Sequence, residues 1–171
     1  MIFKIFWILR GLLYKPFFGK FGFPSYILKP FYLIGSSKLS LGNKVRILQN
    51  FRCEIFDQGS VTINDDVSIG HNCHISSCDQ LVIDSGTVIS SNVFIGALDH
   101  DLTPNHSIPI MLRNNICRST YIGKNVFIGT GAVILAGSVL EDNCVIGANA
   151  VIRDHVPNGF VVKTVQNLFK H

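Results

Sequence analysis

The stretch YIGKNVFIGTGAVILAGSVLEDNCVIGANAVIRDHV (residues 121–156) repeats one pattern every six residues. An α-helix would repeat every 3.6 residues and a plain β-strand every two, so the stretch is neither of these alone. A period of six is typical of a solenoid in which each hexapeptide forms a short strand and a turn, and three hexapeptides close one triangular coil. The repeated apolar positions, which we expect to face the interior, are Ile122, Ile128, Ile134, Leu140, Ile146 and Ile152. The small or β-branched positions four residues later are Val126, Ala132, Ser138, Cys144, Ala150 and Val156.

The same period extends toward the N-terminus, with one shift of phase after Leu81. The earlier apolar positions are Leu41, Ile47, Cys53, Ile63, Ile69, Ile75 and Leu81, followed by Ile83, Ile89 and Ile95. Glycines and asparagines, which suit tight corners and positive φ, recur between them. They are Gly70, Gly96, Gly123, Gly129 and Gly147, together with Asn43, Asn125 and Asn149. We expect about five coils in all.

The repeat is interrupted between Ile95 and Ile122. The 27-residue separation is not a whole number of hexapeptides, so we predict an inserted loop at about residues 97–120. A long loop inside a compact repeat is usually functional. The loop contains His100, five residues after Ile95, and His106.

These motifs resemble the hexapeptide-repeat acyltransferases, and the resemblance implies a left-handed parallel β-helix. Many acetyltransferases of that family have their catalytic histidine at the offset of His100 in "IGALDHDL". An imidazole can take the proton from an attacking hydroxyl near neutral pH. We therefore predict His100 as the general base, with Asp99 or Asp101 as the residue that orients its ring, and His106 as the second choice of base.

The resemblance also implies where acetyl-CoA binds. In "NVFIGTGAVI" the backbone N–H of Thr130 falls where the family contacts the acetyl carbonyl, and in "IGANAVI" that of Ala148 falls where it contacts the pantetheine arm. The basic residues that usually contact the coenzyme phosphates are absent, because Asp154 and Leu168 occupy their places. Arg153, Lys163 or Lys170 are the candidates to replace them. Family members form trimers, so we expect a homotrimer with active sites between subunits.

The first part of the chain has a different composition from the rest. Residues 1–53 contain nine Lys and Arg and no acidic residue, whereas residues 54–171 contain six basic and eleven acidic residues. Eleven of the eighteen aromatic residues lie in residues 1–34. We divide the chain into an aromatic and basic segment (1–35), with a short helix at 2–14 ended by Pro16, and a β-helix domain (36–171).

Basic residues interrupt the N-terminal segment, so we predict neither a membrane-spanning helix nor a signal peptide. Interleaved aromatic and basic residues suit either the membrane interface or packing against the domain or a neighbouring subunit. Nucleic acid is a weaker alternative, because no nucleic-acid motif accompanies the bases.

The five cysteines are odd in number and include no CxxC pair, so we expect no zinc knuckle and require no disulfide framework. This cysteine pattern fits a reducing cytoplasm best, so we expect a cytoplasmic protein, either free or peripheral at the inner membrane face. Cys73 and Cys144 are interpreted as core residues. Cys117, in the insertion, is the cysteine to test as a nucleophile.

The leading functional hypothesis is an acetyl-CoA-dependent O-acetyltransferase that acts directly on a sugar hydroxyl, in surface-polysaccharide biosynthesis. The resemblance supplies that acceptor class, and a small sugar or an antibiotic is the alternative. Zinc carbonic anhydrases share this fold but need a histidine trio. The spacing of His71, His74, His100 and His106 does not match theirs, and we expect no metal. A non-catalytic structural repeat would not need a polar insertion.

Overall fold

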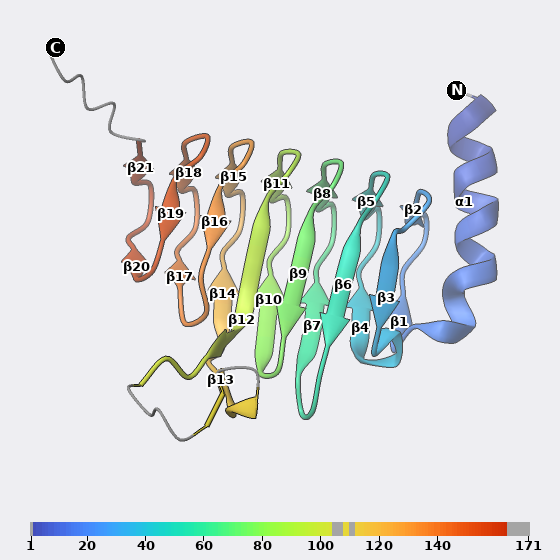
Figure 1. Cartoon of the computed structure of the whole chain (residues 1–171). Helices are drawn as coiled ribbons and strands as arrows, with labels where there is room; N and C mark the ends of the chain where they lie inside the picture. The colour runs from blue at the N-terminus through green and yellow to red at the C-terminus, as the bar shows by residue number, and fades with distance from the viewer. Residues whose placement is uncertain (1, 104–107, 110–111, 164–171) are drawn as a thin grey trace, which may run out of the picture.

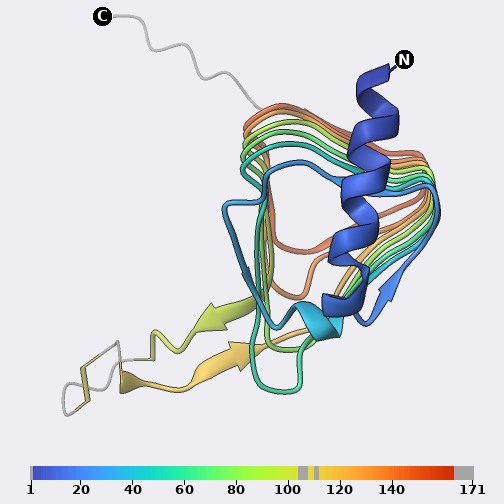
Figure 2. The same ribbon diagram turned by 90° about the vertical axis from the view of Figure 1, so that its right-hand side faces the viewer.

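The chain folds into a parallel β-helix with one α-helix across its N-terminal end (Figure 1). This computed structural model describes residues 2–103, 108–109 and 112–163. Seen from the N-terminal end, the coils wind anticlockwise as they recede, so the β-helix is left-handed (Figure 2). The predicted fold is confirmed.

Three parallel sheets form the walls of the prism. Sheet A contains β1 (Lys20–Phe21), β4 (Leu39–Leu41), β7 (Ser60–Ile63), β10 (Gln80–Ile83), β14 (Thr120–Ile122), β17 (Val139–Leu140) and β20 (His155–Val156). Sheet B contains β2 (Tyr26–Ile27), β5 (Arg46–Ile47), β8 (Ser68–Ile69), β11 (Val88–Ile89), β15 (Phe127–Ile128), β18 (Val145–Ile146) and β21 (Val161–Val162). Sheet C contains β3 (Tyr32–Ile34), β6 (Arg52–Ile55), β9 (His74–Ser77), β12 (Phe94–His100), β16 (Val133–Ile134) and β19 (Val151–Ile152). A 3-10 turn lies at each end of the first coil: Lys15–Phe17 joins α1 to β1, and Ser36–Lys38 joins β3 to β4.

The interior is formed by the two predicted sets of positions, the repeated apolar residues and the small or β-branched residues four positions later. Every member from Ile122 to Val156 is buried, which confirms that prediction. In-register pairing, such as Ile128 with Ile89 and Ile146, stacks equivalent residues of successive coils. Each coil therefore covers the apolar end of the previous one, which a single coil could not do by itself.

The corners use asparagine and glycine for different reasons. Asn125 and Asn149 have φ of 53° and 58°, as predicted. The predicted positive φ at Gly129 is wrong, and the same holds for the other four glycines named with it. A Cβ on Gly129 would lie 2.6 Å from the backbone nitrogen of Ala148, so a close approach between coils requires glycine there. At the predicted Asn43 corner, it is Lys44 that has positive φ, at 56°.

The β-helix is longer than the expected five coils, because sheets A and B have seven strands each. The additional coils lie at the ends. β1, β2 and β3 form the first coil from within the segment 1–35 that we separated by composition, and β21 lies beyond the last clear hexapeptide. The inward positions of this coil keep the spacing of six, and the aromatic residues around them conceal the repeat. The inward residues are Phe21, Ile27 and Leu33, which pair in register with Leu41, Ile47 and Cys53.

Helix α1 (Ile2–Tyr14) matches the predicted helix and covers the N-terminal end of the prism (Figure 2). Its inner side packs closely: Gly11 is buried, the Trp7 ring lies 5.6 Å from that of Tyr26, and Arg10 donates a hydrogen bond to the Ile27 carbonyl. Its other side exposes a row of large apolar residues, Phe6, Leu9, Leu12 and Leu13. Among the described residues, no helix is long and apolar enough to cross a membrane.

The predicted insertion forms an arm that leaves the prism after sheet C and returns to sheet A (Figure 1). Its base is a two-stranded antiparallel ribbon of β12 and β13 (Asn115–Cys117). A disulfide joins Cys117 to Cys78, which lies between β9 and β10. Cys117 is therefore not available as the nucleophile for which we singled it out, and the expectation of reduced cysteines is wrong for this pair, because the ribbon brings Cys117 beside a cysteine 39 residues earlier.

Candidate active site

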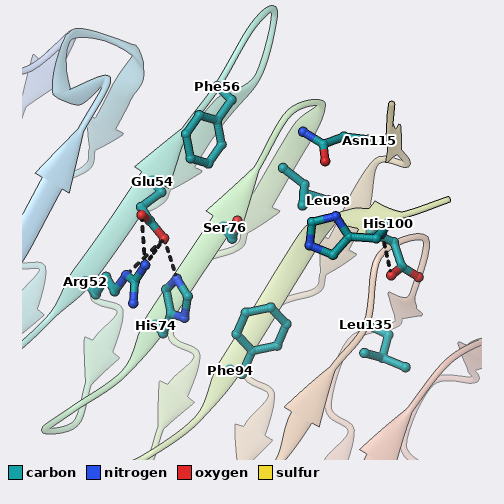
Figure 3. Close-up of a pocket in the computed structure, with 11 residues that line it drawn as sticks. Arg52, Glu54, Phe56, His74, Ser76, Phe94, Leu98, His100, Asn115 and Leu135 are labelled. Atoms are coloured by element: carbon teal, nitrogen blue, oxygen red, sulfur yellow. Dashed lines mark hydrogen bonds and ion pairs between the residues drawn. The ribbon is translucent and has the colours of Figure 1, made fainter. Parts of the chain in front are cut away.

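One pocket of about 480 Å³ lies where the arm leaves sheet C (Figure 3). Its lining comes from three adjacent strands of that sheet (β6, β9 and β12), from β13, and from the residues that follow β6 and β16. The lining residues include Arg52, Glu54, His74, Phe94, Asp99 and His100. A volume of this size is typical of pockets that bind small ligands.

Strand alternation explains which residues of sheet C line the pocket. Cys53, Ile75 and Ile95 point into the core, so the residues on either side of each point outward. Register then aligns Arg52 with His74 and Phe94 as one outward row. The second outward row is Glu54, Ser76 and Gly96. The small residues of the second row, Ser76 and Gly96, leave the open space that forms the pocket.

Three side chains form a charged cluster at one side of the pocket. Arg52 donates two hydrogen bonds of 2.9 Å to the Glu54 carboxylate, and Nε2 of His74 lies 2.9 Å from Glu54 Oε2 (Figure 3). Glu54 is 8% exposed, so a nearly buried carboxylate is held between two partners. The hydrogen bonds from Arg52 lower the pKa of Glu54, and the pKa of Arg52 is raised by the same bonds. Glu54 is therefore an anion at neutral pH.

His100 ends β12 on the opposite side of the pocket, at the start of the arm (Figure 3). It pairs across the ribbon with Asn115, which also lines the pocket. Two residues further on, Cys117 is tied to the wall, so the disulfide anchors the strand that flanks His100. The His100 side chain is exposed, and its ring has no hydrogen-bond partner in the part of the chain that the structure describes.

The two aspartates beside His100 have other partners in this structure. Asp99 lines the pocket, but its carboxylate accepts a hydrogen bond from the backbone N–H of His100 and not from the ring. The Asp101 carboxylate accepts hydrogen bonds from the backbone and hydroxyl of Thr103, which lower its pKa. His106 lies outside the described residues.

The predicted coenzyme residues lie away from this pocket. Thr130 and Ala148 are exposed at neighbouring turns where sheet B passes into sheet C, and the Thr130 carbonyl accepts the N–H of Asn149. His100 lies at the opposite end of sheet C, so a single chain does not bring it to those amides. Lys163 is exposed after β21, and Leu168 and Lys170 lie outside the described residues.

Arg153 has a closer relation to the pocket than the other predicted coenzyme residues. It is exposed and follows Ile152, which pairs with Ile134. Leu135, the residue after Ile134, lines the pocket, so Arg153 occupies the corresponding place one coil further.

Glu54 and Arg52 are not among the residues predicted from the sequence, and His74 is considered there only in the set of histidines that does not match a zinc site. Their signal was their position: each lies directly beside an inward residue, and Glu54 and Arg52 precede His74 by 20 and 22 residues. Such positions face outward, but only the stacking of coils shows that these three meet.

The remaining cysteines are buried, and the arrangement of possible metal ligands can be described. Cys53, Cys73 and Cys144 are buried, which confirms that Cys73 and Cys144 belong to the core. Burial raises the pKa of Cys53 to about 12, so its thiol stays protonated. Within the described ranges, no group of three or more His, Cys, Asp or Glu side chains is placed to hold a metal ion.

Comparison with known proteins agrees with this fold. Residues 119–154 match the family of bacterial transferase hexapeptides (six repeats). The chain is 28% identical over 142 residues to a putative lipopolysaccharide biosynthesis O-acetyl transferase (WbbJ) of Escherichia coli K12, covering 80% of this chain and 72% of the relative. It is 29% identical over 159 residues to the galactoside O-acetyltransferase of the same organism, covering 91% of this chain and 64% of that protein. The chain thus spans about two thirds of the length of the relatives that it matches.

Among solved structures, a point mutant of AntD, an N-acyltransferase from Bacillus cereus in complex with dTDP and coenzyme A, superposes with a TM-score of 0.74. The identity is 22%, and the superposition covers 90% of this chain and 83% of that one. These matches confirm the predicted resemblance to hexapeptide-repeat acyltransferases.

Proposed function

We propose that this hexapeptide-repeat chain is an acetyl-CoA-dependent O-acetyltransferase that acetylates a sugar hydroxyl, with His100 as general base. The observation that carries the proposal is the place of His100, at the mouth of a pocket of about 480 Å³ where the insertion leaves the β-helix. Named O-acetyltransferases among the relatives, and coenzyme A in a structure of the same fold, support the choice of reaction.

The reaction is a direct transfer from thioester to hydroxyl. A ring nitrogen of His100 takes the hydroxyl proton as the oxygen attacks the acetyl carbonyl carbon. The carbonyl oxygen becomes an oxyanion, which a backbone N–H, that of Thr130, stabilises. The carbon–sulfur bond then breaks, and the proton held by His100 passes to the departing sulfur, giving the sugar ester and free coenzyme A. Asp99, beside His100 in the pocket lining, stabilises the imidazolium electrostatically.

The site requires more than one copy of the chain. Thr130 and Ala148 lie at the far edge of sheet C from His100, so their amides reach the thioester only from a neighbouring copy. We therefore propose a homotrimer with the coenzyme between subunits, its phosphates contacted by Arg153 or Lys163. Light scattering is expected to give three times the 18.9 kDa chain mass. A monomeric and fully active protein would contradict this arrangement.

Thioester consumption tests the activity itself. Purified protein is mixed with acetyl-CoA and a panel of sugars and glycans, and free thiol and acetylated product are measured. Hydroxyl-dependent thiol release with a stoichiometric sugar ester supports the proposal. Thiol release without an ester would contradict it.

The acceptor belongs, in this proposal, to a surface polysaccharide made on a lipid carrier at the inner membrane face. The relative named for lipopolysaccharide biosynthesis supports this class. The described surface adds a physical argument. Phe6, Leu9 and Leu13 form a stripe at helical spacing on the side of α1 that does not pack on the β-helix. The first coil adds exposed Phe17, Phe23 and Phe31.

The basic residues around this N-terminal surface indicate what kind of partner it binds. Lys15, Lys20 and Lys29 are exposed, and no acidic residue occurs before Glu54. Apolar side chains surrounded by cations fit an anionic phospholipid bilayer, in which α1 lies at the level of the headgroups. β12 is three strands from β3, so the strand that carries His100 lies roughly 14 Å from the first coil at about 4.8 Å per strand. A sugar on a membrane-bound carrier can reach that height.

The double substitution Leu9→Glu, Leu13→Glu is expected to lower the partition of the protein onto phosphatidylglycerol-containing vesicles by at least about tenfold, because each leucine loses its burial in the interface. Co-sedimentation measures the effect, and wild-type binding should weaken with salt. Leu112→Glu, at a leucine that is 74% exposed on the arm, is the matched control and should bind normally. The membrane role would be contradicted if the wild type does not bind the vesicles. If the double variant then also loses its oligomers, this surface is a contact between copies of the chain.

A further inference from the structure

The pocket contains a second functional group besides His100, the cluster of Arg52, Glu54 and His74. We propose that this cluster is the acceptor subsite and that it binds an uncharged sugar ring through its hydroxyls. The inference rests on the proposed function and specifies its substrate. The proposal follows from the hydrogen-bonding groups that these three residues leave open.

The cluster offers both donors and acceptors. A carboxylate only accepts hydrogen bonds, so His74 must carry its proton on Nε2, where it faces Glu54. In the neutral ring, Nδ1 is then an acceptor. The Glu54 oxygens receive three hydrogen bonds and have lone pairs to spare, and Arg52 keeps N–H groups that do not contact Glu54. A sugar hydroxyl donates one hydrogen bond and accepts others, so neighbouring hydroxyls match this mixed set.

The net charge of the lining argues against an acidic ligand. Glu54 already neutralises the guanidinium of Arg52 by a bidentate ion pair. Asp99 adds an anion, and the lining residues include no other Lys or Arg. The charges of Arg52 (+1), Glu54 (−1) and Asp99 (−1) therefore sum to −1. A phosphate or carboxylate would lose its hydration in this pocket without gaining an unpaired cation as a partner. A neutral sugar ring has no charge to desolvate and therefore avoids this cost.

The shape of the pocket suits a ring with one polar edge and one apolar face. Phe94 packs edge-on against His74, with ring centroids 5.1 Å apart, and Phe56 stands on the other side of the hollow (Figure 3). Ser76 lies between Glu54 and His100 in this view, and its small side chain leaves the floor open. Apolar C–H groups of a sugar can lie against Phe94 while hydroxyls reach the cluster.

The subsite is also within reach of the base. Glu54 and Gly96 are separated by two strand spacings, roughly 10 Å, and His100 lies four residues beyond Gly96, roughly 13 Å further along the strand. The side chains of Glu54 and His100 both line the pocket and shorten this separation from its two ends. A sugar held at the cluster therefore extends one hydroxyl toward His100. The cluster fixes which hydroxyl that is, because it binds the others.

The substitution Glu54→Gln tests the subsite while keeping the shape of the side chain. Initial rates are measured with acetyl-CoA and methyl glycosides of glucose, galactose and mannose, each beside its uronic acid. The wild type should favour the neutral sugars. In Glu54→Gln, the KM for the best neutral acceptor should rise at least about tenfold, because hydrogen bonds to a charged group are lost, while the KM for acetyl-CoA stays unchanged. Arg52 is then unpaired, so the preference for neutral over uronic acceptors should fall about tenfold or more.

Two further variants separate binding from folding. Glu141→Gln changes another carboxylate that pairs with a histidine, His155 at 2.8 Å, on a different wall, and should leave both KM values unchanged. Ser76→Leu fills the floor beside Glu54 but keeps both residues of the ion pair, and should also raise the acceptor KM alone. Circular dichroism confirms that each variant is folded.

Two results would overturn the subsite. One is a wild type that prefers uronic acceptors, and the other is a folded Glu54→Gln that keeps the wild-type acceptor KM and preference. Both differ from the failure of the proposed function, in which the wild type acetylates no sugar in the panel.

Discussion

The substitution His100→Ala is expected to lower kcat for acetyl transfer by roughly 10²–10⁴-fold, the usual contribution of a general base. The KM for acetyl-CoA should change little, because the thioester is held by backbone amides and the coenzyme by other residues. Stopped-flow or steady-state thiol release with the best sugar acceptor measures the effect. In transition-state terms the loss is about 3–5 kcal/mol at saturating substrate.

His71→Ala is the matched control for this experiment. His71 is an exposed histidine at a corner between β8 and β9, outside the pocket lining, and its loss should leave the rate unchanged. A His100→Ala rate within about threefold of the wild type would exclude the general-base role. If both variants lose activity together, a folding defect is the cause, and melting curves will show it.

The substitution Leu140→Ala is expected to destabilise the protein by about 2–5 kcal/mol, the range for removing a buried leucine side chain. Leu140 is fully buried, and its strand β17 pairs with β14 and β20. The cavity would therefore weaken the contacts of one coil with both neighbours. Because a solenoid is stabilised mainly by interfaces between successive coils, a local loss reduces the stability of the whole. Urea unfolding followed by circular dichroism measures the change.

Val139→Ala is the control, because Val139 is next in sequence but points outward and is 37% exposed. Its replacement should cost less than about 1 kcal/mol. Equal effects at the two positions would mean that the six-residue pattern does not separate inside from outside. Such a result would remove the physical basis of the fold assignment.

The sequence predicted the C-terminal coils well and the first coil poorly. From Ile122 onward each hexapeptide has an aliphatic residue at the inward position, and the structure buries all of them. In the first coil, Phe21 and Ile27 are the inward residues, and the surrounding aromatics do not repeat with period six. Composition therefore separated residues 20–34 from the coil that they form. A repeat is recognisable in the sequence only where the corners of successive coils pack in a similar way.

The candidate site was predicted in one half only. His100 could be found because it lies where the repeat stops, which is a feature of the linear sequence. Glu54 and His74 lie within the repeat, where an outward residue is usually a solvated one. Nothing local distinguishes them from Arg46 and Asp66, which form an exposed ion pair on another wall.

By itself, the sequence determined that the chain is a three-walled β-helix, because each hexapeptide repeats the same choice of inward and outward residues and each coil contacts only its neighbours. It also determined where the wall is interrupted. Only the tertiary structure decided which outward residues meet: Arg52, Glu54 and His74 form one cluster, and Cys78 pairs with Cys117. Those contacts depend on the lengths of the corners and on the register between coils, which bring together residues that the sequence keeps 20 to 39 positions apart.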